Sequence, residues 1–92
     1  MLKALRLSEL LVALDARLVG ADAVFSAVST DSRKIEPGQL FIALTGPNFD
    51  GHAYLAAVAA KGAVAVLVER EVVGVELPQL VVADTRLALG QL

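Results

Sequence analysis

The sequence predicts an α/β domain with a small βαβ-containing sheet and flanking helices. Two short apolar runs, Leu40–Leu44 and Ala63–Val68, have the composition of strands that are buried on both faces. Between them lie a polar loop and the alanine-rich segment Ala53–Lys61, which is typical of a helix. A strand, a helix and a second strand within about thirty residues are typical of a parallel βαβ unit, which we expect to be right-handed.

The composition favours a single domain with a buried core. The chain has 92 residues, of which 57% are hydrophobic and 20% charged, and its formal net charge is −2. This composition is the opposite of a disordered chain, and it provides no broad basic surface for nucleic acid or an anionic membrane. The absence of cysteine excludes a disulfide scaffold, a thiol nucleophile and a cysteine-rich zinc site. A reducing compartment is compatible with this absence.

The most apolar stretch, Ala53–Val68, is too interrupted to span a membrane. Lys61 and Gly62 stand near its middle, whereas a spanning helix needs roughly 18–20 apolar residues with few charges. A lysine followed by a glycine is typical of the end of a soluble helix. The N-terminal segment carries Glu9 and Asp15 within its apolar pattern, so it is not typical of a signal peptide. We therefore expect a soluble, cytoplasmic protein that does not insert into a membrane.

The first element predicted along the chain is a helix over about residues 8–18. Ser8 is its expected N-cap and Gly20 its expected end. The prediction rests on leucines that recur at helical spacing. These leucines are Leu7, Leu10, Leu11, Leu14 and Leu18.

Two further strands and a tight turn complete the predicted sheet. Val24–Thr30 is rich in strand-forming residues. Pro37 and Gly38 predict a turn before the buried run that follows, because proline fixes φ and glycine permits a positive φ. A polar connection over residues 69–76 precedes the last predicted strand, Leu80–Val82.

The chain ends within a predicted helix. Asp84 or Thr85 is expected to cap this helix, and the residues that follow contain no stop signal other than Gly90. A helix of this length needs tertiary support. We therefore expect residues 1–84 to form one domain, and residues 85–92 to begin the helix or linker to a further domain of a longer protein.

Two polar loops form the predicted ligand site, because ligands of parallel sheets bind beyond the carboxyl ends of the strands. The loop over residues 30–34 provides hydroxyl groups and the Arg33 guanidinium, which can bind a phosphate bidentately. The loop over residues 45–52 is rich in Gly, Pro and Asn, which predicts irregular structure. Its Gly46 and Gly51 offer main-chain donors ahead of a helix N-terminus suited to anions. Together the loops predict a phosphorylated or nucleotide-bearing ligand.

Each of these residues also has a purely structural interpretation. Asp31 and Ser32 are equally typical of a local turn, and Arg33 is compatible with a solvated surface. Asp50 is compatible with a cap at the start of a helix. His52 is more typical of a polar residue in a first helical turn than of a catalytic base, since the sequence pairs it with no serine or cysteine nucleophile.

The sequence lacks the familiar motifs of nucleotide hydrolysis, hydride transfer and metal binding. It contains neither the G-x-x-x-x-G-K-[ST] phosphate loop nor the G-x-G-x-x-G fingerprint, and no H-E-x-x-H or clustered metal ligands. These observations predict a small α/β binding module with no catalytic residue, metal site or cofactor of its own. The alternative is an interaction module that has no nucleotide site and meets a partner through its apolar surface.

Five segments carry a family resemblance: TDSR at 30–33, PGQLFIAL at 37–44, Gly46, FDGH at 49–52 and LPQLVVADTR at 77–86. In this order they resemble the N-terminal domain of the Mur ligases, which are ATP-dependent amide-bond ligases that build the peptide stem of bacterial peptidoglycan. The last two segments are most similar to those of the members that add D-Ala-D-Ala to UDP-N-acetylmuramoyl-tripeptide. The members that add the third stem residue share the D-S-R and D-G segments and are the alternative.

The resemblance implies a domain that holds the UDP end of a sugar-nucleotide substrate. In the family, a central phosphate-loop domain binds ATP and Mg²⁺ and activates the stem carboxylate as an acyl phosphate, and a C-terminal domain helps to bind the incoming D-Ala-D-Ala. This chain matches the first domain only, so residues 85–92 would lead to an absent ATP-binding domain. The implied full-length protein is an ATP-dependent ligase, and the chain alone is expected to be inactive.

The resemblance also implies contacts to UDP from both polar loops. Arg33 is the expected pyrophosphate partner. The residues implied to contact the UDP moiety are Thr30, Ser32, Arg33, Pro47, Asn48 and Phe49. The residues expected to shape the two loops are Asp31, Gly46, Asp50, Gly51 and His52.

Overall fold

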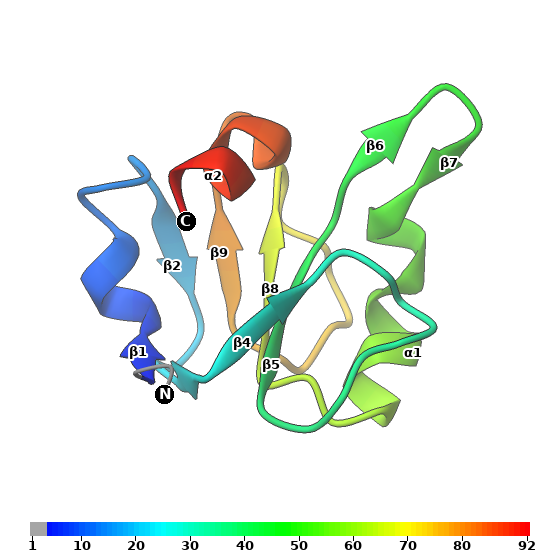
Figure 1. Cartoon of the computed structure of the whole chain (residues 1–92), viewed down its shortest axis with the longest axis horizontal. Coiled ribbons are helices and arrows are strands. Elements are labelled where there is room, and N and C mark those ends of the chain that lie inside the picture. Colours follow the sequence, from blue (N-terminus) through cyan, green and yellow to red (C-terminus); the bar gives the residue numbers. More distant parts are fainter. Residues whose placement is uncertain (1–3) are drawn as a thin grey trace.

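The computed structural model describes residues 4–92, and their central feature is a five-stranded sheet with the strand order β2-β9-β8-β5-β4. Strands β4, β5, β8 and β9 are parallel, and β2 pairs antiparallel with β9 at one edge (Figure 1). The predicted α/β class is therefore confirmed. The strands are β2 (Arg17–Val19), β4 (Ala27–Ser29), β5 (Gln39–Ile42), β8 (Ala65–Val68) and β9 (Gln79–Val81).

The central βαβ unit has the parallel arrangement that the sequence predicts. Strand β5 pairs with β8 in parallel, and α1 (Leu55–Ala60) connects them after the 3-10 helix η2 (Gly51–Tyr54). Gly62, which follows the C-cap residue Lys61, terminates helix α1 and has a φ of 99°. The N–H of Ala63 donates to the Val58 carbonyl and that of Gly62 to the Ala59 carbonyl, which is the Schellman pattern of a glycine-terminated helix. The predicted lysine–glycine stop is thus confirmed.

Alternating side chains of the sheet enter two separate apolar clusters. Leu40 and Ile42 of β5 lie in the cluster that also contains residues of η1 (Leu7–Leu10) and Ala88 of α2 (Thr85–Gln91). Phe41, between them, lies in the cluster with the buried side chains of α1. Because both faces of β5 are covered, its residues form a continuous apolar run, as is usual for central parallel strands.

The N-terminal segment is not the helix predicted over residues 8–18. It forms only η1 and a few turns, which end at Asp15 with a φ of 51°. The N–H of Ala16 then donates to the Leu11 carbonyl, and the chain continues into β2. Pairing with β9 recruits Leu18 into this edge strand, so a tertiary contact overrides the helical spacing of the leucines. Ser8 is not the N-cap, because its N–H and hydroxyl both donate to Asp22.

The predicted strand over Val24–Thr30 is divided between two sheets. Its first part, β3 (Val24–Phe25), pairs with β1 (Leu5–Arg6), and its second part, β4, pairs with β5. The break falls at Ser26, whose N–H donates to the Gly38 carbonyl. The chain can therefore cover the sheet with buried Phe25 before it enters the sheet as its edge strand.

The loop over residues 45–52 is more regular than its composition predicts. Strands β6 (Thr45–Gly46) and β7 (Phe49–Asp50) form a hairpin that projects beyond the carboxyl end of β5 (Figure 1). The prediction of irregular structure was wrong because glycine is needed within this hairpin. A Cβ on Gly46 would lie 2.8 Å from Cε1 of the Phe49 ring, so glycine at this position lets the ring lie close over the neighbouring strand.

The remaining turns and caps agree with the sequence. The N–H of Gln39 donates to the Glu36 carbonyl across the predicted turn, in which Gly38 has a φ of 87°. Asp84 caps α2 by accepting the N–H of Leu87. In the connection after β8, the buried amide of Gln79 both donates to and accepts from the main chain of Val72, at 2.8 Å each. Within residues 4–92, no helix combines the length and the apolar composition needed to cross a membrane.

Candidate functional site

A cavity of about 480 Å³ opens beyond the carboxyl ends of β4 and β5. The turn after β4 forms one side of it, and the segment Phe49–Tyr54 forms the other. We call this segment the hairpin wall. The structure thus brings together the two loops that the sequence singles out. The lining residues are Thr30, Asp31, Ser32, Arg33, Phe41, Phe49, Gly51 and Tyr54.

The turn Thr30–Arg33 is held mainly by bonds to its own neighbours. The N–H of Lys34 donates to the Asp31 carbonyl at 3.1 Å. One longer-range contact reaches it, in which Nζ of Lys61, at the end of α1, donates to the Ser32 carbonyl at 3.1 Å. This side of the cavity is therefore a solvated, locally closed turn.

Asp31 orients the Arg33 guanidinium at the rim of the cavity. Nε and Nη2 of Arg33 donate to the two carboxylate oxygens at 3.2 and 3.3 Å, and the N–H of Arg33 donates to Oδ1 at 2.9 Å. These bonds from Arg33 hold the pKa of Asp31 below its ordinary value. The guanidinium has more N–H donors than Asp31 uses, and 84% of the side chain is exposed. Arg33 is thus oriented by Asp31 and keeps donors for an anion.

The hairpin wall presents aromatic rings to the same cavity. Phe49 is 51% exposed and Tyr54 is 46% exposed, which is unusual for large rings in a small domain. Phe41, from β5, is buried at the base. Gly51 lies so close to β5 that a Cβ there would be 2.9 Å from both the Ala43 Cα and the Leu44 N. The wall is therefore pressed against the end of the strand.

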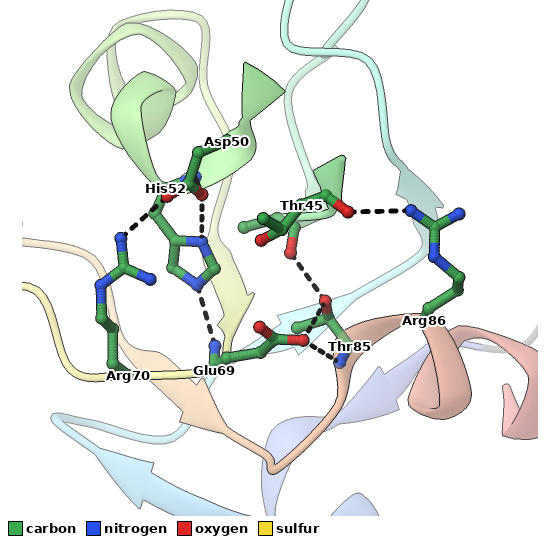
Figure 2. A network of polar contacts seen from close by, with 8 residues as sticks. Thr45, Asp50, His52, Glu69, Arg70, Thr85 and Arg86 are labelled. Carbon is green, nitrogen blue, oxygen red and sulfur yellow. Dashed lines mark hydrogen bonds and ion pairs between the residues drawn. The ribbon is translucent and has the colours of Figure 1, made fainter. Parts of the chain in front are cut away.

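Two residues of the hairpin wall, Asp50 and His52, do not line the cavity and belong instead to a polar network (Figure 2). Oδ1 of Asp50 accepts the His52 N–H at 2.9 Å and lies 2.6 Å from Nδ1 of the same imidazole. Arg70 donates to Oδ2 at 3.0 Å. These bonds, the His52 main-chain N–H first, hold the pKa of Asp50 well below its ordinary value.

The network continues from His52 to the first residue of α2. Nε2 of His52 accepts the main-chain N–H of Glu69 at 2.9 Å. The Glu69 carboxylate accepts the N–H of Thr85 at 3.0 Å. The Thr85 hydroxyl donates to the Ala43 carbonyl at 2.8 Å and lies 3.2 Å from the Glu69 carboxylate. Arg86 donates to the Thr45 carbonyl at 3.0 Å. The ends of β5 and β8, the hairpin and α2 are thus joined by polar contacts (Figure 2).

The sequence-predicted residues separate into four places. The turn residues, Phe49 and Gly51 line the cavity, whereas Gly46 lies beneath the Phe49 ring. Pro47 and Asn48 form the exposed tip of the hairpin. Asp50 and His52 belong to the wall but contact the polar network and not the cavity. The predicted helix N-terminus does not adjoin the loop, because η2 intervenes and α1 begins only at Leu55.

Sequence reasoning missed several residues of the site. Tyr54 follows Gly51 at i+3 in a 3-10 helix, where such residues lie on one face, so a correct assignment of η2 would have found it. Phe41 carries no such signal, because it stands within an apolar run that packs on both faces. Glu69 and Thr85 could be connected to His52 only through coordinates.

Within residues 4–92, no group of three or more acidic or histidine side chains is arranged to hold a metal ion. The described side chains therefore offer no metal site of that kind for the Mg²⁺ that the family resemblance implies for a full-length protein. What they fit is a ligand that offers a flat apolar part to the rings and an anionic or polar part to the turn.

A comparison with known protein families finds a match over residues 24–92 to the family described as "Mur ligase family, catalytic domain". This match covers most of the chain. It includes both sides of the cavity and the whole polar network.

Curated relatives agree with this match. The chain is 50% identical over 86 residues to the UDP-N-acetylmuramoyl-tripeptide–D-alanyl-D-alanine ligase of Escherichia coli (strain K12), covering 94% of this chain and 19% of the relative. It is 45% identical over 72 residues to the UDP-N-acetylmuramoyl-L-alanyl-D-glutamate–2,6-diaminopimelate ligase of Mesorhizobium japonicum, covering 76% of this chain and 15% of the relative. The chain therefore spans less than a fifth of the length of these two relatives.

Solved structures give the same result for the fold. The crystal structure of MurF from Acinetobacter baumannii superposes on 99% of this chain with a TM-score of 0.87 and 40% sequence identity, and the match covers 20% of that chain. The similarity extends over the sheet, the helices and the hairpin that together form the cavity.

Proposed function

This chain belongs to the Mur ligase family, and we propose that it is the domain that binds the UDP portion of UDP-N-acetylmuramoyl-tripeptide in a D-Ala-D-Ala-adding ligase. The names of the similar ligases supply the substrate, and the cavity between the turn and the hairpin wall supplies the binding site. The activity of the whole protein, including its use of ATP and Mg²⁺, belongs to this proposal.

One observation carries the proposal: the cavity combines two kinds of surface that a nucleotide needs. Exposed aromatic rings on the hairpin wall suit the flat face of a base. Hydroxyl groups and a guanidinium on the opposite turn suit a diphosphate. The volume of about 480 Å³ falls within the range of small-molecule sites, which is about 300–1,000 Å³.

The proposed roles follow these positions. Phe49 and Tyr54 would contact the uracil and ribose, and Thr30 and Ser32 would hydrogen-bond to the diphosphate or ribose. Arg33, already oriented by Asp31, would bind the pyrophosphate. Pro47 and Asn48, at the tip of the hairpin, would extend the uridine contact beyond the cavity. No residue of this chain is assigned a catalytic step.

Binding at this domain would contribute to catalysis from a distance. Holding the UDP end fixes one end of the substrate, so that the stem carboxylate is presented to the reacting groups elsewhere in the protein. ATP and Mg²⁺ would act there, outside residues 1–92, and the 92-residue chain alone would be inactive. We also propose that residues 85–92 lead toward that part of the protein, although Thr85 and Ala88 are buried against this domain.

We assign the tripeptide substrate to this protein, and not the dipeptide substrate named for the diaminopimelate-adding relatives. The support is the higher identity and the wider coverage of the match to the D-Ala-D-Ala-adding relative. Both relatives' names contain UDP-N-acetylmuramoyl, so the assignment of the cavity to the UDP end is the same for either substrate.

The direct test is a titration of the ¹⁵N-labelled chain with UDP, followed by NMR. The amide signals of residues 30–33 and 49–54 should shift together with one dissociation constant, whereas those of Val12 and Val73, which are almost fully exposed elsewhere, should not. An absence of shifts at millimolar UDP would contradict the proposed site in the isolated chain and favour an interaction module without a nucleotide site.

The charge of Arg33 provides a matched comparison. Arg33→Ala should weaken the binding of UDP about five- to tenfold by removing charge-assisted hydrogen bonds, and it should leave the weaker binding of uridine unchanged. In the full-length ligase the same variant should raise the KM for the sugar nucleotide with little change in kcat. Equal losses for UDP and uridine would show that Arg33 does not contact the diphosphate.

A further inference from the structure

His52 is held in one neutral tautomer by its two neighbours. Its side chain is 1% exposed. Nε2 faces the main-chain N–H of Glu69 at 2.9 Å, and because that group can only donate, Nε2 must carry the lone pair. Nδ1, which lies 2.6 Å from Oδ1 of Asp50, then carries the proton and donates. The imidazole is thus a bridge with one donor end and one acceptor end.

This bridge links the hairpin wall to the sheet. Along the wall, Gly51 donates to the Leu44 carbonyl at 2.8 Å, and Asp50 binds Arg70 across a partly exposed surface. The contact of the buried His52 side chain with Glu69 joins the wall to the residue that directly follows β8. This contact therefore fixes the wall to the end of β8, as the Gly51 bond fixes it to the end of β5.

We propose that His52 is a positioning residue for nucleotide binding. It holds the hairpin wall in the position in which Phe49 and Gly51 line the cavity. The identity of the ligand rests on the proposed function, whereas the fixing of the wall does not. The contact that matters is the acceptor bond from the Glu69 N–H. The bond to Asp50, two residues away in the chain, sets the tautomer.

The physical reason is preorganisation. If the wall loses its contact with Glu69, it occupies other positions in part of the molecules. The apparent affinity for a ligand is then the intrinsic affinity multiplied by the fraction of molecules that remain competent to bind. The charged groups near His52 do not replace that contact. Asp50 already accepts from Arg70, and the Glu69 carboxylate is bound to Thr85.

Two substitutions separate the two ends of the imidazole. His52→Gln can place an amide oxygen near the position of Nε2 and so still accept the Glu69 N–H. His52→Asn can place an amide nitrogen near the position of Nδ1 and keep only the donor to Asp50. We expect His52→Asn to raise the Kd for UDP about tenfold by lowering the competent fraction, and His52→Gln to raise it at most about threefold.

Gln79→Ala is the matched control for lost buried polar contacts. Gln79 is buried and makes two bonds to Val72, away from the cavity. This variant should lose stability without changing the Kd for UDP. Equal effects of His52→Asn and His52→Gln on that Kd, or an effect of Gln79→Ala as large as that of His52→Asn, would overturn the proposal.

Measurements without ligand keep the inference separate from the proposed function. In the wild-type chain, the ring ¹⁵N signals of His52 should show a protonated Nδ1 and an unprotonated Nε2. The Gly51 amide, bonded to Leu44, should exchange with solvent faster in His52→Asn than in His52→Gln. If the wild-type protein does not bind UDP, the proposed function fails. The exchange rates of the Gly51 amide then decide alone whether His52 positions the wall. A protonated Nε2, or equal exchange in the two variants, would refute the positioning role.

Discussion

The two sides of the cavity are built in opposite ways. The turn Thr30–Arg33 closes largely on itself, and its main charged group, Arg33, is 84% exposed. The hairpin wall is short and glycine-containing, yet it is fixed to the sheet by a close backbone approach at Gly51 and by the buried bridge of His52. The turn can therefore adjust to a ligand, whereas the wall provides a fixed surface.

This difference separates two tasks of a binding site. An exposed guanidinium contributes charge and changes its contacts at little cost. An aromatic platform is useful only if its position is set before the ligand arrives. Substitutions in the wall should therefore change both stability and affinity, and substitutions in the turn should change affinity alone.

The largest expected effect is the insertion of a side chain where the wall meets β5. Gly51→Ala puts a Cβ within 3.0 Å of backbone atoms of Ala43 and Leu44, which cannot move aside. We expect the free energy of unfolding to fall by about 1–3 kcal/mol, measured by urea denaturation.

Gly90→Ala in α2 is the control, because its Cβ would meet nothing within 4 Å, and it should stabilise the helix by about 0.5 kcal/mol. If Gly51→Ala were as stable as this control, the wall would not be pressed against the strand.

The next effect concerns the two aspartates, one on each side. The pKa of Asp50 is lowered further than that of Asp31, because Asp50 accepts from both His52 and Arg70. A carboxyl group whose pKa is lowered by folding stabilises the folded state. This contribution is complete at pH values above the ordinary pKa of about 3.9, and it is lost as the pH falls from there toward the lowered pKa.

Stability measured from pH 7 down to pH 2 should therefore depend less on pH in Asp50→Asn than in the wild type. Asp31→Asn should change that dependence less. The reverse order would mean that the turn, and not the wall, carries the acid-sensitive contacts.

A smaller effect is expected beneath the Phe49 ring. Gly46→Ala places a Cβ 2.8 Å from Cε1 of that ring, and the ring, being half exposed, can move. The free energy of unfolding should change by less than about 0.5 kcal/mol, whereas the Kd for UDP should rise about threefold. The shift of the Phe49 ring protons reports the movement. Unchanged ring signals would show that the hairpin absorbs the methyl group elsewhere.

The smallest effect should come from the one long-range contact of the turn. Lys61→Met removes the bond from Nζ to the Ser32 carbonyl and keeps a good helix former at the end of α1. Because the contact is exposed, stability should change by less than about 0.5 kcal/mol, and only the amide signals near Ser32 should shift. A loss comparable to that of Gly51→Ala would show that the turn is anchored as firmly as the wall.

The parts of the fold that the sequence predicts correctly are those with a local cause. The apolar run at β5, the glycine at the end of α1, the Pro37-Gly38 turn and the Asp84 cap depend on residues a few positions apart. The predicted N-terminal helix failed because Leu18 pairs with Leu80, at the other end of the chain. No local pattern contains that contact.

The candidate site divides in the same way. The position of the two loops follows from parallel strand order, so the turn residues and Phe49 could be anticipated. The location of His52 in the loop was evident, but its partner is the main-chain N–H of Glu69, and a main-chain group leaves no signature in the sequence. Its role as a bridge therefore became visible only in the structure.

The pairing of β2 with β9 has a consequence for how the molecule is made. Arg17 of β2 lies opposite Val81 of β9, so β2 cannot pair in the sheet until β9 has been synthesised. Contacts between residues so far apart in the sequence form slowly, because the entropy of closing a long loop is lost before the contacts stabilise the chain. Until β9 is available, β8 keeps an open edge after it has paired with β5, and the N-terminal leucines lack contacts with Leu80 and Val82 in their apolar cluster. The five-stranded sheet can therefore be completed only after residues 79–81 have been synthesised.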